Sequence, residues 1–355
     1  MRLRSVCTFS LALTCFVLSA QEKETTFSTD VKVVNVFATV RDKQGKIVSN
    51  LNKEDFVLSE NGAEQPIRYF SREVDLPLTI GLLVDTSGSQ RGVLGQEKTA
   101  SYTFLDKILK PDRDQTFVIH FDFESELLQD LTSSRKALQN ALDQLELPAG
   151  MRQFRRRLLA DNWQFPGGGM GGRFPGGGGM GRGGRGGSRY PGAGGPRGGG
   201  GGGRGGTTLY DAVYLASDEI LRHQTGRKAI ILLTDGVDHG SKTSLSSAVE
   251  SAQRADTLVY SILFTDENAA FGNRADGRRV LQKISQETGG NFFEASKKLT
   301  IDQIYERIQE ELRSQYSIGY SPASGAASEF RAIKLTTKRQ GMIVTAREGY
   351  YPAAH

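Results

Sequence analysis

Residues 78–92, LTIGLLVDTSGSQRG, form an apolar run that stops at an acid and two serines. Residues 78–84 are almost continuously apolar or β-branched, a pattern typical of a strand that is buried on both faces of a parallel sheet. Asp85, Ser87 and Ser89 follow where that strand ends. Because ligands bind at the carboxyl ends of the strands in open parallel sheets, a binding site is expected in this loop.

Further runs in the middle of the chain have the same character, and helical patterns separate them. The runs cover residues 116–121, 229–233 and 258–264. Ala212, Val213, Ala216 and Ile220 recur at helical spacing between the first two of these runs. Strands that alternate with helices predict an α/β fold with a doubly wound, mostly parallel sheet, which we place at residues 76–313.

Two later helices have recognisable ends. Apolar residues at helical spacing mark one helix around residues 280–284, and Gly289 with Gly290 supplies its C-terminal stop. The last helix covers residues 301–312. Thr300 and Gln303 form a capping-box pattern at its start.

The two flanks of the α/β region have strand patterns instead. Residues 31–48 alternate, and residues 56–70 predict a hairpin that turns at Asn61 and Gly62, a pair suited to a type I′ turn. Residues 316–320, 330–337 and 342–347 are further strand candidates. Since neither flank has enough strands to bury a core alone, we predict that residues 27–75 and 314–355 form one small β-sandwich-like domain. Two separate β-rich extensions are the alternative.

The first twenty residues have the layout of a secretory signal peptide. Arg2 and Arg4 precede an apolar segment that ends in small residues, which predicts cleavage before Gln21. An uncleaved N-terminal anchor is the alternative. Both cysteines, Cys7 and Cys15, lie in this leader, so the mature chain has no disulfide. We expect an exported protein of the periplasm, the cell envelope or the extracellular space.

The composition changes between residues 150 and 206. This segment holds 26 of the 43 glycines and ten arginines, with Asp161 as its one acid, for a net charge of +9. Removing that +9 from the chain's +5 leaves −4 for the rest. Glycine loses the most backbone freedom on folding, and the segment offers little apolar surface in return. We therefore expect a disordered, basic insertion, called here the Gly/Arg-rich insertion.

More polar residues converge with the loop at Asp85. Asp235 leaves the strand at residues 229–233 in the same way, and Thr207 opens the helix that follows the insertion. Two carboxylates and three hydroxyls form an all-oxygen donor set, which suits Mg²⁺ or Mn²⁺ and suits Zn²⁺ poorly for lack of His and Cys. Two carboxylates do no more than balance the charge of a divalent cation. The cation therefore stays electrophilic toward an added ligand oxygen.

At these residues the chain resembles a known family. The motifs DTSGS, GGTTLYD and TDG, in this order, are similar to the metal-ion-dependent adhesion site (MIDAS) of von Willebrand factor type A (VWA) domains. The resemblance covers the whole α/β region apart from the Gly/Arg-rich insertion. The flanks resemble those of the exported VWFA-related domain proteins of the acidobacterial type.

The resemblance implies a role for each candidate residue. Ser87 and Ser89 correspond to direct metal ligands, and Thr207 corresponds to a direct or water-bridged ligand. Asp85 and Asp235 correspond to acids that act mainly through water. Thr208 is a weaker substitute for Thr207. The long insertion that ends next to Thr207 departs from the family pattern and bears on how a partner reaches the metal.

Other polar residues favour ordinary structural roles. His120, His223, His239 and His355 are scattered and show no ligand spacing. Asp122 and Glu124 have no companion nucleophile or base, so we interpret them as a solvated strand end rather than a catalytic pair. Arginine and glycine repeats also occur in RNA-binding segments, but export argues against a nucleic-acid partner.

Two functions follow from these residues, and neither is enzymatic. The first is an exported binding or adhesion module whose Mg²⁺ or Mn²⁺ captures an acidic group of a protein or polysaccharide. The alternative is an envelope scaffold or assembly factor that recruits partners through the basic insertion, with a metal that is only structural. The sequence identifies neither the partner nor the oligomeric state.

Overall fold

A computed structural model describes residues 33–73, 76–90, 92–145, 207–264, 274–322 and 329–352. The predicted leader at residues 1–20 and the Gly/Arg-rich insertion at residues 150–206 lie outside the described residues, as do the first residues of the N-terminal flank. Among the helices that are described, none combines the length and apolar character needed to cross a membrane.

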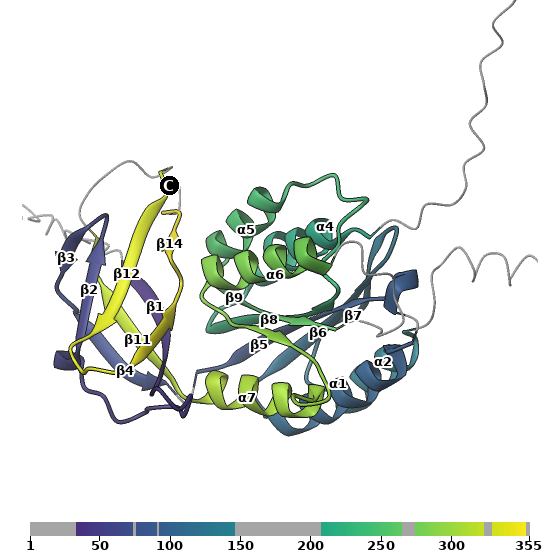
Figure 1. The fold of residues 1–355 in the computed structure, drawn as a ribbon, viewed down its shortest axis with the longest axis horizontal. Helices are drawn as coiled ribbons and strands as arrows, with labels where there is room; N and C mark the ends of the chain where they lie inside the picture. Colours follow the sequence, from purple (N-terminus) through teal and green to yellow (C-terminus); the bar gives the residue numbers. More distant parts are fainter. Residues whose placement is uncertain are drawn as a thin grey trace, which may run out of the picture. The chain divides into compact units, whose positions relative to one another are not determined.

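A six-stranded sheet lies at the centre of the α/β part (Figure 1). Its strands, in spatial order, are β10 (Phe292–Glu294), β9 (Thr257–Leu263), β8 (Arg227–Thr234), β5 (Leu78–Asp85), β6 (Gln115–Phe121) and β7 (Ser125–Thr132). All neighbours are parallel except β7, which runs antiparallel to β6. Every residue of β5 and β8 is buried, as their apolar sequences require. The predicted fold class is confirmed.

Helices cover both faces of this sheet (Figure 1). On one face, α1 (Leu94–Ile108), α2 (Arg135–Asp143) and α7 (Ile301–Arg313) share a core with Leu82 and Val84 of β5. On the other face, α4 (Leu209–Tyr214), α5 (Leu245–Arg254) and α6 (Arg274–Thr288) share a core with Leu83. A π-helical turn, η3 (Leu215–Ile220), and a 3₁₀ turn, η4 (Leu221–His223), continue α4. Alternate side chains of β5 thus enter different cores.

Both predicted helix ends are present. At the start of α7, the Thr300 side chain accepts a hydrogen bond from the backbone N–H of Gln303 at 3.4 Å, and the Gln303 side chain accepts from the N–H of Thr300 at 3.1 Å. After α6, Gly289 has a φ of +86°. A Cβ at that position would lie 2.3 Å from the backbone nitrogen of Arg347, so the close approach also requires glycine.

Strands from the two flanks pair with one another in two four-stranded antiparallel sheets. One sheet has the order β13 (Ile343–Ala346), β1 (Val34–Arg41), β11 (Gln315–Tyr320) and β4 (Tyr69–Glu73). The other has the order β14 (Gly349–Tyr350), β12 (Arg331–Thr337), β2 (Phe56–Glu60) and β3 (Ala63–Gln65). One apolar core joins residues of both sheets. The flanks therefore form one sandwich, whereas the domain limits at residues 76 and 313 stay a prediction.

The hairpin between β2 and β3 has the predicted turn. Asn61 and Gly62 connect the strands, and their φ angles are +49° and +84°. A type I′ turn requires a positive φ at both central residues, which asparagine and glycine tolerate best. A 3₁₀ turn, η1 (Lys53–Asp55), precedes β2.

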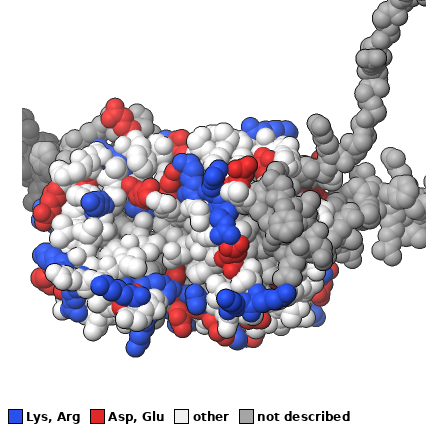
Figure 2. Space-filling model, in the orientation of Figure 1, with Lys and Arg blue, Asp and Glu red and all other residues white. Residues whose placement is uncertain are grey.

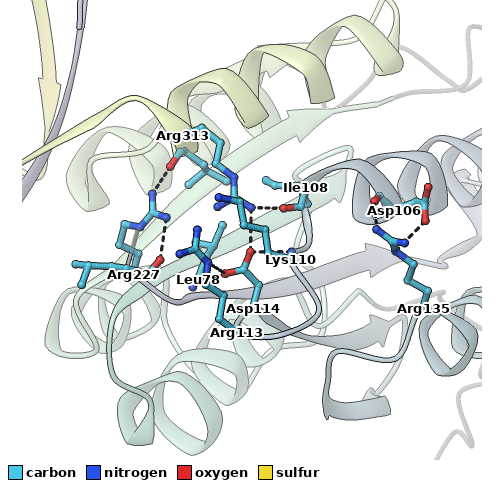
Figure 3. Close-up of polar contacts among 11 residues, drawn as sticks. Leu78, Asp106, Ile108, Lys110, Arg113, Asp114, Arg135, Arg227 and Arg313 are labelled. Carbon is cyan, nitrogen blue, oxygen red and sulfur yellow. Dashed lines mark hydrogen bonds and ion pairs between the residues drawn. The ribbon is translucent and has the colours of Figure 1, made fainter. Parts of the chain in front are cut away.

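Asp114 holds several chain segments together at the amino ends of the parallel strands (Figure 3). The residue is fully buried, and its carboxylate accepts hydrogen bonds from the backbone N–H of Leu78 at 3.1 Å and of Lys110 at 3.0 Å. It also pairs with the guanidinium of Arg313, at the end of α7, at 2.9 Å. One carboxylate thus links the start of β5, the segment before β6 and the end of α7.

Arg227 connects the two points where the chain enters and leaves the α/β part (Figure 3). This buried guanidinium donates to the carbonyl of Leu76, just before β5, at 3.0 Å. It also donates to the carbonyl of Leu312, next to the end of α7. A single side chain therefore contacts both places where the chain passes between the sandwich and the α/β part.

Candidate metal site

The loop after β5 places three candidate residues close together. The backbone N–H of Ser87 donates to Oδ1 of Asp85 at 2.8 Å, which forms a tight turn directly after the strand. The hydroxyls of Ser87 and Ser89 lie 2.9 Å apart. Ser87 is buried and Ser89 is half-buried, so the pair lies at the boundary between the core and solvent. A 3₁₀ turn, η2 (Gly88–Gln90), then leads toward α1.

Asp85 is fully buried between the ends of β5 and β8. The Thr234 hydroxyl, at the end of β8, donates to Oδ2 of Asp85 at 2.6 Å. Burial raises the pKa of Asp85 to about 7; the charge of Asp235 adds to this increase, and hydrogen bonds from Thr234 and Ser87 oppose it. These neutral donors leave the carboxylate without a countercharge, which a cation would supply.

Asp235 follows β8 in a loop that touches the start of α6. Its Oδ1 accepts a hydrogen bond from the N–H of Val237 at 3.0 Å. Gly236 has a φ of +80°, and a Cβ on it would lie 2.4 Å from the carbonyl oxygen of Gly277 in α6. A Cβ on Gly277 would lie 2.1 Å from the carbonyl oxygen of Asp235. Both glycines are therefore needed for this backbone contact.

The same loop holds Thr207 in place through its backbone. The carbonyl oxygen of Thr207 accepts hydrogen bonds from the N–H groups of His239 and Gly240, both at 3.1 Å. Thr207 itself is buried and lies two residues before α4. The loop after β8, which also carries Asp235, is therefore joined to the segment that leads into α4.

Further hydrogen bonds tie this loop to the start of α4. The Ser241 hydroxyl accepts from the N–H groups of Tyr210 at 3.0 Å and Asp211 at 3.1 Å. In return, the Asp211 carboxylate accepts from the N–H groups of Lys242 at 3.0 Å and Thr243 at 2.8 Å. The loops that carry Asp235 and Thr207 are thus interlocked, although the roles of the five candidate residues as ligands stay a prediction.

The polar turn between β6 and β7 differs from the prediction. Glu124 is exposed, but Asp122 is only 2% exposed, so the interpretation of both as a solvated strand end is wrong for Asp122. The reason is that Thr208 covers the turn. Its N–H and hydroxyl donate to the carbonyl of Asp122 at 2.8 and 3.2 Å, and its hydroxyl lies 3.0 Å from that of Ser125. This engagement makes Thr207 the better candidate ligand.

Two buried side chains that the sequence analysis did not identify lie just beyond the serines. Gln90 ends η2 and Glu97 lies in the first turn of α1; both are buried, and their terminal nitrogen and oxygen atoms have no hydrogen-bond partner in the described part of the chain. Burial raises the pKa of Glu97 well above its ordinary value, and the charges of Asp85 and Asp235 raise it further. The described part of the chain therefore supplies no hydrogen-bond partner for these two buried polar groups.

The donor set at this edge combines carboxylates with hydroxyls. In the described ranges, no group of three or more His, Cys, Asp and Glu side chains is arranged to hold a metal ion. The candidate site therefore depends on the oxygens of Ser87, Ser89 and Thr207 as well as on the acids. Oxygen donors of this kind suit hard divalent cations.

We expect Gly277→Ala to lower the free energy of unfolding, although alanine is the better helix former. The added Cβ would collide with the carbonyl oxygen of Asp235 at 2.1 Å, and overpacking of this kind costs about 1–3 kcal/mol. Gly95→Ala is the matched control in the first turn of α1, where nothing lies within 4 Å of the added Cβ. The control should stabilise by about 0.4–1 kcal/mol. Urea unfolding measures both; an equal gain in the two variants would contradict the contact.

Comparisons with known proteins agree with this architecture. Residues 202–307 match the family described as von Willebrand factor type A domain. No curated protein matches the sequence.

Several solved structures are similar to this chain at low sequence identity. Proximal thread matrix protein 1 from the mussel byssus is 15% identical with a TM-score of 0.44, over 72% of this chain and 51% of that one. This chain thus spans about half the length of the mussel protein. A von Willebrand factor type A structure from Catenulispora acidiphila is 12% identical with a TM-score of 0.44, over 90% and 73% of the two chains. Manganese-loaded TRAP protein from Plasmodium vivax is 12% identical with a TM-score of 0.38, over 80% and 98%.

The family match and the fold lead to the same assignment. The matched residues include Thr207, β8, Asp235, β9 and α6. The strand β5, with the DTSGS loop at its carboxyl end, is paired directly with β8 in the same parallel sheet. The chain therefore contains a von Willebrand factor type A domain.

Proposed function

We propose that this protein is an exported, non-enzymatic binding module that captures an acidic group of a protein or glycan through a divalent cation. The supporting observation is the meeting of the Asp85 loop with the interlocked loops of Asp235 and Thr207 at one sheet edge. The VWA match gives this edge its adhesion-type interpretation, since VWA domains are generally interaction modules.

The residues at this edge suit Mg²⁺ or Mn²⁺. Ser87 and Ser89 would hold the cation, with Thr207 as a further direct or water-bridged ligand. Asp85 and Asp235 would balance its charge. When bound, the cation supplies the positive charge that attracts a carboxylate oxygen of the partner. Asp235 and Ser89 are only half-buried, which supports access from solvent.

The charge of the described surface supports a protein or glycan partner rather than a nucleic acid. Figure 2 shows Lys and Arg side chains interspersed with Asp and Glu over the described part of one face. A nucleic-acid interface would concentrate basic side chains in a patch or stripe.

A second candidate function is an envelope scaffold or assembly factor that recruits partners through the Gly/Arg-rich insertion. The observation that favours it is the net charge of +9 in a segment that ends one residue before Thr207. In this case the cation would only stabilise the domain. Exposed charge pairs are each worth at most about 1 kcal/mol and are screened by salt, so such recruitment should weaken steeply as salt rises.

We expect Mg²⁺ or Mn²⁺ to stabilise the folded protein, because only the folded chain brings the three loops together. The gain should be about 2.7 kcal/mol at a cation concentration one hundred times the Kd. Asp85→Ala should remove this gain without unfolding the domain. Calorimetric melting with and without cation, together with isothermal titration of the metal, measures both effects. A wild-type protein that binds neither cation would show that the site is misassigned.

Capture of an acidic polymer distinguishes the two functions. The wild type should be retained on immobilised polyglutamate with Mn²⁺ and released by EDTA, whereas Asp85→Ala should not be retained. Retention that survives EDTA, but is lost with salt or on deletion of residues 165–204, would favour the scaffold instead.

A further inference from the structure

His120 is a buried histidine that contacts the loop of the candidate metal site. It lies in β6, next to Val84 of β5, and its side chain is 2% exposed. Its Nδ1 lies 3.1 Å from the hydroxyl of Thr86, and its Nε2 lies 3.1 Å from a carboxylate oxygen of Glu126. Strand register explains the second contact, because His120 and Glu126 stand directly opposite each other in the β6–β7 pair. One imidazole thus joins β7 to the segment that follows β5.

Thr86 is the point where the sheet releases the chain into the loop of the two serines. It is the second residue of the DTSGS motif, between Asp85 and Ser87. Its backbone N–H donates to the carbonyl of Phe121 at 3.0 Å, which continues the β5–β6 pairing one residue beyond the end of β5. The chain then turns, where the N–H of Ser87 donates to Asp85 at 2.8 Å. The position of Thr86 therefore sets where the loop begins.

The two contacts of His120 fit one arrangement of hydrogen-bond donors and acceptors. A carboxylate only accepts hydrogen bonds, so Nε2 donates to Glu126. A neutral imidazole then presents Nδ1 as an acceptor, and the Thr86 hydroxyl donates to it. The other acceptor near this hydroxyl, the carbonyl of Phe121, lies farther away at 3.5 Å. His120 is therefore the partner that holds the Thr86 side chain in its rotamer.

An acid, a histidine and a hydroxyl in this order also occur in nucleophilic catalysis, but burial argues against that role here. Thr86 is 1% exposed, so its hydroxyl is closed to a substrate. The three side chains instead form a row that runs from Glu126, whose side chain is 65% exposed, to the inside of the loop. Such a row orients a loop rather than reacting with a ligand.

We propose that His120 is a positioning residue of the metal site. Oriented by Glu126, it fixes Thr86, and the loop then presents its two serine hydroxyls in a set arrangement before the cation arrives. A loop that is already ordered loses less conformational freedom on binding, so His120 strengthens cation binding without contacting the cation. This inference rests on the proposed function, because it takes the cation to bind at the serines. It goes further, because none of the three site motifs includes His120.

His120→Phe and Thr86→Val test this inference from the two ends of one contact. The first variant keeps an aromatic ring and removes both ring nitrogens, and the second keeps the branched shape and removes the hydroxyl. Isothermal titration of each variant should give an Mn²⁺ affinity about three- to tenfold weaker than that of the wild type, the range expected for loss of one neutral hydrogen bond. Thr86→Ser, which keeps the hydroxyl, should retain most of the wild-type affinity.

The double variant shows whether the two side chains act through each other. If they do, His120→Phe combined with Thr86→Val should lose clearly less Mn²⁺ affinity than the two single losses added together as free energies. Fully additive losses would mean that the two side chains act independently, which overturns the inference. Thr86→Val and Thr86→Ser alone decide the question if His120→Phe does not fold.

Ser285→Ala is the matched control, because it removes a buried hydrogen bond elsewhere in the α/β part. Ser285 of α6 is 1% exposed, and its hydroxyl donates to that of Ser261 in β9 at 2.9 Å. This variant should melt at a lower temperature than the wild type and should bind Mn²⁺ with unchanged affinity. An affinity loss equal to that of His120→Phe would assign the effect to general destabilisation and overturn the inference.

The outcomes separate this inference from the proposed function. A wild type that binds Mn²⁺, with equally tight His120→Phe and Thr86→Val variants, overturns the inference alone. Variants that differ from the wild type only in melting temperature have the same meaning, because the role of the contact would then be structural. A wild type that binds no Mn²⁺ overturns the proposed function and the inference together.

Discussion

Removal of residues 330–355 is expected to unfold the whole β-sandwich, including strands at the opposite end of the chain. The truncation takes away β12, β13 and β14, and with them Ile333, Leu335 and Tyr350 of the shared core. Each large buried apolar side chain contributes about 1.5–3 kcal/mol. The remaining strands β1 and β2 also lose pairing partners. Amide hydrogen exchange should therefore show lost protection across residues 34–60.

A pair of point variants tests the same core with a smaller change. Leu335 is buried opposite Leu58 in the β12–β2 pair, and Leu335→Ala should cost about 2–5 kcal/mol. Ile343 on β13 is 60% exposed, so Ile343→Ala should change stability by no more than about 0.5 kcal/mol. Full protection of β1 and β2 in the truncated protein would show that the N-terminal flank is independent.

Asp114→Ala is expected to lower the free energy of unfolding by about 3–5 kcal/mol, the usual cost of breaking a buried ion pair from one side. The substitution leaves the Arg313 guanidinium without its carboxylate and frees the backbone N–H groups of Leu78 and Lys110. The effect should appear as a shift of the midpoint in denaturant unfolding. Because Asp114 lies at the amino ends of the strands, Mn²⁺ affinity of the folded protein should stay unchanged.

The pair of Asp106 and Arg135 supplies the control for Asp114, and Figure 3 shows both. Their side chains lie 2.9 Å apart, but they are 47% and 46% exposed. Exposed ion pairs contribute about 0–1 kcal/mol, so Asp106→Ala should be nearly neutral. Equal losses in the two variants would mean that burial of Asp114 does not determine its contribution.

The parts of the fold that the sequence predicts are those with local causes. The continuous apolar runs of β5 and β8 need burial on both faces, and that need alone indicates a parallel sheet with helices on each side. Thr300 with Gln303, and Asn61 with Gly62, act within a few residues, so their patterns predict the helix start and the hairpin turn that the structure contains.

Features that depend on distant segments were not predictable in the same way. Asp114 lies in the polar stretch KPDRDQ, which indicates only a turn, and its burial depends on Arg313, 199 residues away. Asp122 was misinterpreted for a similar reason, because Thr208, which covers it, lies 86 residues further along the chain. The antiparallel strand β7 has an irregular burial pattern and pairs with β6 through register shifts, so no simple alternation marks it.

The candidate site likewise contains residues that a local pattern predicts and residues that depend on how distant segments pack. The rule that ligands bind at the carboxyl ends of parallel strands predicted that Asp85 and Asp235 would meet, and β5 and β8 are neighbours. Glu97 has no comparable motif, because it stands in the polar stretch GQEKT at the start of a helix, where glutamate is ordinarily solvated. Its burial follows from how α1 packs on the sheet, which the local sequence does not specify.

The pairing between the flanks also has a consequence for the order of events during synthesis. Arg339 donates to Asp55 across 284 residues, and the buried Tyr320 reaches Glu60 across 260. As the chain emerges with its N-terminus first, β1 to β4 must therefore wait for their partners while the entire α/β part follows. The sandwich closes last, and until then the N-terminal strands expose unpaired edges of the kind that a chaperone would need to protect.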